Sequence, residues 1–201
     1  MTVLSDQAES ADPVSYDTLI LGLGNVLWAD EGFGVRTAEA LNARYTFAPG
    51  VHVMDGGTQG IFLIPWVRSA RRLLILDAVD YGLAPGTLKV VLDDDVPRFM
   101  GAKKVSMHQA GFQEVLMSAK LTGDFPDKIA LVGVQPELLD DYGGSLTARV
   151  KARVPDAIDA ALSVLADWDV AYQKRSEPLA ETDLIGPGAL AIDGYESGRP
   201  I

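Results

Sequence analysis

The chain of 201 residues contains no cysteine. This absence excludes disulfide bonds, thiolate metal sites and a cysteine nucleophile, and it is typical of a protein from a reducing compartment. Long hydrophobic runs are also missing, because the longest are far shorter than the roughly 20 residues that a helix needs to cross a bilayer. Residues 1–13 are polar and acidic and do not resemble a signal peptide. We therefore expect a cytoplasmic protein with no membrane insertion.

Basic residues are scarce relative to acidic ones. The chain has 17 lysines and arginines against 28 aspartates and glutamates, which gives a formal net charge of -11. A surface of this sign argues against binding to nucleic acid, because the phosphate backbone attracts basic side chains. It permits a protein partner with a basic patch, although acidity that serves only solubility accounts for the same composition.

Several catalytic and nucleotide-binding motifs are absent as well. The sequence has no P-loop and no Gly-x-Ser-x-Gly nucleophile turn. Gly22-x-Gly24 begins a dinucleotide fingerprint, and Asp55 stands where an acid would bind ribose, but the third glycine is replaced by Leu27. Asp30 and Glu31 would also repel a pyrophosphate. A dinucleotide oxidoreductase is therefore a disfavoured alternative, and absence of nicotinamide binding would remove it.

Apolar runs alternate with helical patterns along most of the chain. This alternation predicts an α/β fold: a single three-layer domain with a mostly parallel, twisted sheet of about five strands and helices on both faces. We assign residues 1–15 to a flexible N-terminal segment, 16–172 to the α/β domain and 173–201 to a mobile C-terminal tail. The predicted strands are 17–21, 51–54, 72–76, 87–92 and 128–134. The predicted helices are 31–45, 61–70, 107–121 and 145–170, the last of them interrupted by Pro155.

Three side chains are candidates for a common site. Glu31 follows the first strand, Asp77 ends the third, and His108 opens a helix. Two carboxylates and one imidazole suit nickel, zinc, iron or manganese. Structural roles compete with this interpretation: Asp30 is placed to cap the first helix, Glu31 lies in its first turn, and a lone histidine is commonly structural. The other histidine, His52, lies within a short strand and is expected to be structural.

The segment 22–34 reads Gly-x-Gly-Asn-x-Leu-x-x-Asp-Glu-Gly-x-Gly and resembles the signature of the nickel-iron hydrogenase maturation endopeptidases. The residues at 108–116 and 141–146 look most like the branch that serves uptake hydrogenases. The resemblance covers roughly residues 17–170. Four further motifs of the family follow in the same order: Asp55-Gly56-Gly57-Thr58-x-Gly60, Asp77-Ala78-Val79-Asp80, Met107-His108-Gln109 and Val132-Gly133-Val134-Gln135-Pro136.

The resemblance implies a peptidase whose substrate is the precursor of the hydrogenase large subunit. Such an enzyme removes a short C-terminal peptide after nickel insertion. The family's metal-binding positions match Glu31, Asp77 and His108, and the nickel is expected to come with the substrate, with none tightly bound at rest. We expect the loop of Asp55, Gly56, Gly57 and Thr58 to bind the extended substrate peptide through its backbone, although a tight turn explains the two glycines equally well.

No nucleophile and base pair is evident in the sequence. We expect metal-assisted hydrolysis, in which the substrate's nickel polarises the scissile carbonyl or activates water. Asp77 or Glu31 is the candidate general base. A non-catalytic assembly factor that checks nickel occupancy of the large subunit is the alternative, and stoichiometric binding without truncation would favour it.

Overall fold

The computed structural model describes residues 15–102, 107–177, 179, 183–186, 190 and 192–197. Residues 1–14, most of the predicted N-terminal segment, lie outside this set. A five-stranded sheet has the order β3 (Val51–Gly57), β1 (Tyr16–Leu23), β4 (Ala70–Ala78), β6 (Lys128–Val134), β5 (Leu88–Leu92). The first four strands are parallel, and β5 runs antiparallel to β6. The predicted fold class and the mostly parallel sheet are confirmed.

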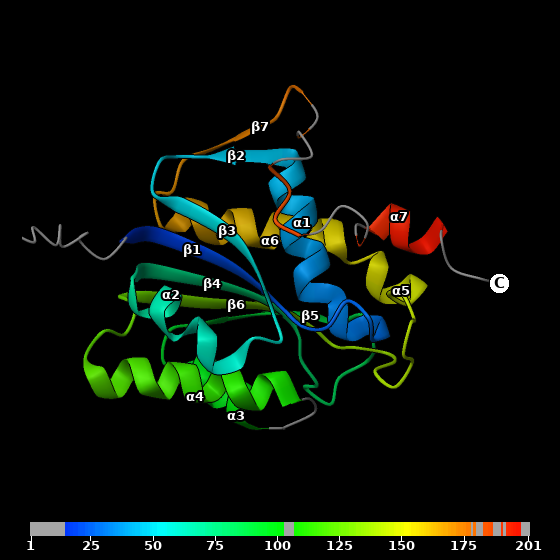
Figure 1. The fold of residues 1–201 in the computed structure, drawn as a ribbon, viewed down its shortest axis with the longest axis horizontal. Helices are drawn as coiled ribbons and strands as arrows, with labels where there is room; N and C mark the ends of the chain where they lie inside the picture. The colour runs from blue at the N-terminus through cyan, green and yellow to red at the C-terminus, as the bar shows by residue number, and fades with distance from the viewer. Residues whose placement is uncertain are drawn as a thin grey trace, which may run out of the picture.

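Helices cover both faces of this sheet (Figure 1). One face is covered by α1 (Phe33–Arg44), α5 (Ala148–Lys151) and α6 (Val154–Asp167). The other is covered by α2 (Ile64–Arg68), α3 (Asp95–Ala102) and α4 (Met107–Thr122). Two 3-10 turns, η1 (Ala29–Gly32) and η2 (Gly60–Leu63), follow β1 and β3. No helix in the described ranges is long and apolar enough to span a membrane.

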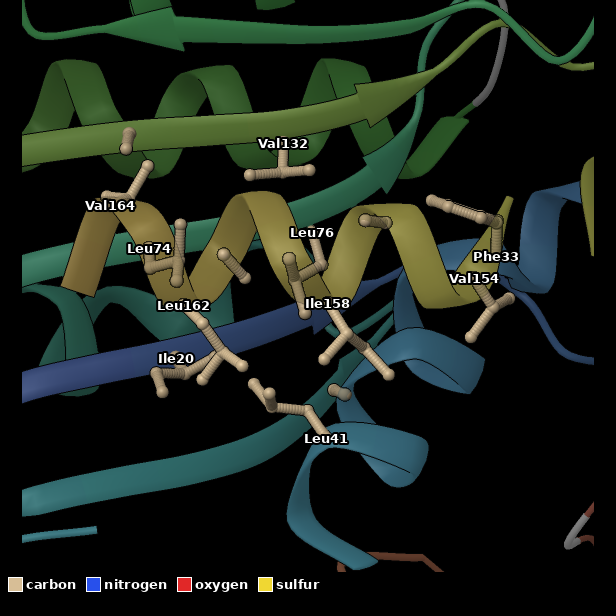
Figure 2. Close-up of a cluster of buried hydrophobic side chains, with 14 of the residues drawn as sticks. Ile20, Phe33, Leu41, Leu74, Leu76, Val132, Val154, Ile158, Leu162 and Val164 are labelled. Carbon is tan, nitrogen blue, oxygen red and sulfur yellow. The ribbon is translucent and has the colours of Figure 1, made fainter. Parts of the chain in front are cut away.

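The sheet separates two hydrophobic cores because successive side chains of a strand point to opposite faces. In β4, Leu74 and Leu76 pack toward α1 and α6, whereas Leu73 and Ile75 pack toward α2 and α4. Figure 2 shows the first of these cores, with Ile158 of α6 directed at the sheet. The wholly apolar run of β4 is therefore explained by burial on both sides, as in other parallel sheets.

The predicted helix 145–170, whose pattern Pro155 interrupts, is divided in the structure into α5 and α6. Thr147 caps α5 and accepts a hydrogen bond from Val150 N, and the chain turns before α6 begins at Val154. Pro155 lies in the first turn of α6, where its missing N–H costs no helical hydrogen bond. In the interior of a continuous helix the same proline would remove a hydrogen bond and clash with the preceding turn.

A second, two-stranded sheet was not predicted. β2 (Tyr45–Phe47) directly follows α1 and pairs antiparallel with β7 (Tyr172–Lys174), which reaches into the predicted tail. Three-residue strands with half-exposed or exposed side chains carry too little periodicity to be recognised from sequence.

The predicted tail also contains α7 (Ile192–Ser197), which contacts the domain. The Glu196 carboxylate accepts hydrogen bonds from Ser145 Oγ at 2.7 Å and from Lys151 Nζ at 2.6 Å. Arg36 Nη1 donates to the carbonyl oxygen of Leu190. The described part of the segment is therefore held against α1 and α5, and its mobility stays a prediction.

His52 stacks with two aromatic rings, as expected for a structural histidine. Its ring centroid lies 5.2 Å from that of Tyr16 and 5.4 Å from that of Trp66. Desolvation at this position lowers the pKa of His52 below 6.5. The folded protein therefore binds fewer protons here than the unfolded chain, so this contribution weakens the fold as the pH falls through about 6.5.

Because the pKa of His52 is lower in the folded protein than in the unfolded chain, we expect the stability to depend on pH. His52→Phe should reduce that dependence. Phenylalanine keeps a ring in the stack but does not titrate. Urea unfolding of both proteins at pH 7.5 and 5.5 measures the effect, and we expect the stability loss on acidification to be smaller in the variant. An equal loss in both proteins would contradict the assignment.

Candidate active site at the carboxyl edge of the sheet

The sheet changes direction of winding around β1. The chain passes from β1 to β3 on one side and from β4 to β5 and β6 on the other. The two connections therefore diverge at the carboxyl ends of β1 and β4. In open α/β sheets, ligands bind at such a switch point. Glu31 lies in η1 directly after β1, and Asp77 is the second-last residue of β4. The fold therefore brings the two predicted carboxylates to the same edge.

Two glycines allow the close backbone contacts that position the segment carrying Glu31. A Cβ added to Gly24, which has φ +120°, would clash with the carbonyl oxygen of Glu31. A Cβ on Gly34 would clash with the carbonyl oxygens of Leu23 and Leu76, at the ends of β1 and β4. The glycines of the motif are thus required because η1 and the start of α1 lie directly on the strand ends.

Asp77 is fully buried at the end of β4. Its Oδ1 accepts a hydrogen bond from Ala78 N at 2.8 Å, and its backbone pairs with Gly133 of β6. The hydroxyl of Tyr81 occupies the space that a side chain at Gly133 would need. Burial, together with the charge of Asp77, raises the pKa of Tyr81, so the phenol stays protonated beside this carboxyl group.

Asp30 does not cap the first helix, and that prediction is wrong. α1 begins at Phe33, after η1, and no side chain caps either element. The Asp30 side chain is instead fully buried and accepts four hydrogen bonds. Its donors lie far along the chain: Glu137 N at 2.9 Å, Leu138 N at 3.0 Å, Thr147 N at 2.7 Å and Thr147 Oγ1 at 3.1 Å.

His108 lies in the first turn of α4, and its side chain is outside the described set. α4 begins at the same edge of the sheet (Figure 1), and Gly111, one turn later, packs against Gly60 of η2. A Cβ on Gly111 would lie 3.4 Å from Gly60 Cα. Among the described side chains, no three histidines, aspartates or glutamates gather closely enough to hold a metal ion.

The residues of the predicted peptide-binding loop lie in two different surroundings. Gly57 O accepts a hydrogen bond from Gly24 N at 3.1 Å, so this part adjoins the first glycine turn, and the Thr58 side chain is exposed. Asp55 points elsewhere: it shares the α1 face of the sheet with Val53, opposite to the face of Asp77. Burial raises the pKa of Asp55, and the nearby charge of Arg36 lowers it to a smaller extent.

Comparison with known proteins identifies the family of the chain. The family model HycI, described as hydrogenase maturation protease, matches residues 35–164, more than half of the chain. The chain belongs to the hydrogenase maturation protease family. Its enzyme class is therefore a hydrolase, in place of the dinucleotide oxidoreductase alternative. The matched span contains Asp77 and His108, whereas Glu31 precedes it.

Individual relatives agree with the hydrogenase maturation protease family. Hydrogenase expression/formation protein HoxM of Azotobacter vinelandii is 55% identical over 182 residues, covering 90% of this chain and 86% of that protein. The Hydrogenase 2 maturation protease of Escherichia coli is 41% identical over 153 residues, covering 76% and 92%. The structure of the E. coli hydrogenase maturating endopeptidase HybD has a TM-score of 0.75 at 39% identity, covering 79% of this chain and 98% of that one.

The close approach at Gly24 predicts a large effect of Gly24→Ala. The added Cβ would meet the backbone of Glu31, which cannot move without displacing η1, and we expect a loss of about 3 kcal/mol or more in unfolding free energy. Gly123→Ala is the matched control, because Gly123 also has a positive φ (+81°) but a Cβ there meets nothing within 4 Å. Its expected cost is about 1 kcal/mol. Equal losses in urea unfolding would contradict the steric explanation.

Proposed function

We propose that this protein is a cytoplasmic endopeptidase that removes the C-terminal peptide of the nickel-iron hydrogenase large-subunit precursor after nickel insertion. The observation that carries the proposal is the placement of Glu31 and Asp77 at one switch point, with α4 and His108 starting at the same edge. The relatives' names refer to hydrogenase expression and formation and to hydrogenase maturation. An acidic protein is compatible with a basic surface on such a partner.

In this proposal the nickel arrives as part of the substrate. Glu31, Asp77 and His108 supply two carboxylate oxygens and one imidazole nitrogen, a donor set that suits nickel. The three residues sense whether nickel has been inserted, because a precursor without the metal lacks the group that they would bind. Burial of Asp77 strengthens its interaction with a cation, since the surroundings screen charge less than water does.

The nickel then serves as a Lewis acid or activates a water molecule for attack on the scissile carbonyl. Asp77 or Glu31 takes the proton from the attacking water as general base. Asp77 is well suited to hold a fixed direction, because it is fully buried and one oxygen accepts a hydrogen bond from Ala78 N. Glu31 is half-buried and thus reachable from solvent.

The end of β3 and the loop after it supply a surface for the substrate. Gly56, Gly57 and Thr58 adjoin the glycine turn of β1 and offer backbone groups to an extended peptide. Ile61 and Phe62 follow in η2, with exposed fractions of 59% and 76%. Exposed side chains of this size beside the proposed site favour contact with a protein substrate over a small molecule.

We expect Asp77→Asn and Glu31→Gln to lower the rate of processing at least 100-fold, because each removes a negative charge from the proposed metal and proton site. His108→Gln should do the same by removing the imidazole. His52→Phe is the matched histidine control and should process normally. Mass spectrometry of a nickel-loaded precursor follows the loss of its C-terminal peptide.

Binding must be measured beside cleavage in this comparison. A pull-down with the precursor shows whether each variant still forms the complex. If Asp77→Asn bound the precursor and cleaved it at an undiminished rate, both proposed roles of Asp77 would be wrong. Binding by the wild-type protein without truncation would instead support an assembly factor.

A further inference from the structure

We propose that Asp30 is a positioning residue for this reaction, because its buried carboxylate sets where Glu31 stands relative to Asp77. The inference rests on the proposed function, since it takes Glu31 and Asp77 as the groups that act on the substrate. It concerns a different residue from that proposal, however, and its outcome is separable. Asp30 itself does not touch substrate in this account.

The Asp30 carboxylate is saturated by its own protein. A carboxylate offers about four lone-pair positions, and Asp30 receives four donors at 2.7–3.1 Å. Its side chain is fully buried, whereas the adjacent Glu31 is half-buried. Of the two neighbouring acids, Asp30 is therefore held in the interior, whereas Glu31 lies nearer to solvent.

The donors connect η1 to the loop that follows β6. The Asp30 backbone joins the same loop, because Asp30 N donates to Leu138 O at 3.1 Å. Further along the loop, Ala29 N donates to Gly144 O at 3.2 Å and Gly143 N donates to Leu27 O at 2.7 Å. The segment directly before Glu31 is thus bonded at Leu27, Ala29 and Asp30 to residues after β6.

That loop is a direct extension of the strand beside Asp77. Gly133 and Val134 of β6 pair with Asp77 and Ala78 of β4, and Val79 N donates to Val134 O at 2.8 Å. Three residues after Val134, the chain reaches the first donor to Asp30. A displacement of the loop therefore changes the separation between the Glu31 segment and Asp77.

Only an acceptor fits the Asp30 position. All four partners donate to Asp30. An asparagine would keep one acceptor oxygen, but its amide nitrogen would face donors and lose the hydrogen bonds made to the oxygen it replaces. Asparagine keeps the size and shape of the side chain, which makes Asp30→Asn a test of the hydrogen bonds themselves. Loss of an acceptor for these buried donors loosens the connection without opening a large cavity.

We expect Asp30→Asn to lower kcat for processing of the nickel-loaded precursor at least tenfold while KM changes less than threefold. Thr147→Val, which removes one donor to Asp30 and the cap of α5, should lower kcat several-fold, and Thr147→Ser, which keeps the hydroxyl, should restore it. Ile158→Val in the core beneath α6 controls for a general loss of stability and should keep the wild-type kcat.

A second readout follows the metal site without the precursor. Calorimetric titration with Ni²⁺ alone should show at least tenfold weaker binding by Asp30→Asn than by Ile158→Val. The proposal is wrong if Asp30→Asn and Thr147→Val keep both kcat and Ni²⁺ binding while Glu31→Gln loses them, and in that case the proposed function stands. If Glu31→Gln keeps full activity, the proposed function fails. Should Asp30→Asn not fold, the Thr147→Val and Thr147→Ser pair decides the matter.

Discussion

The site depends on a backbone contact at the ends of β1 and β4. Because Gly24 and Gly34 have no side chains, the backbone from η1 to the start of α1 lies directly against the carboxyl-terminal parts of these strands. The separation of Glu31 and Asp77 is consequently set by main chain against main chain, where small displacements are costly. Asp30 fixes the other side of the same segment through four hydrogen bonds to the loop after β6.

The elements that carry strong local patterns could be predicted from the sequence. Residues 73–76 of β4 and 129–132 of β6 are uninterrupted apolar runs because both faces of the sheet are covered. Ile158, Ala161 and Leu162 of α6 form the buried stripe that their spacing indicates. The carboxyl ends of such strands meet at one edge, so the placement of Glu31 and Asp77 there also followed from the pattern. The family resemblance, confirmed by the comparisons, supplied the chemistry that spacing alone left open.

What the sequence could not reveal depends on contacts between distant residues. Asp30 has the sequence context of a helix cap, and its partners lie 107–117 residues away. Ser145 and Lys151, which hold Glu196 of α7, precede it by 51 and 45 residues. That Asp55 and Asp77 lie on opposite faces of the sheet could also be recognised only from the strand register. Each of these features is set by tertiary packing, which leaves no local periodicity in the chain.

Processing is proposed to depend on nickel carried by the substrate. Mass spectrometry of the large-subunit precursor after incubation with the wild-type protein tests it most directly, with nickel-loaded and nickel-free precursor in parallel. We expect loss of one discrete C-terminal peptide from the nickel-loaded precursor and none from the nickel-free form. Equal cleavage of both forms would contradict nickel sensing and show a peptidase whose specificity is independent of the metal.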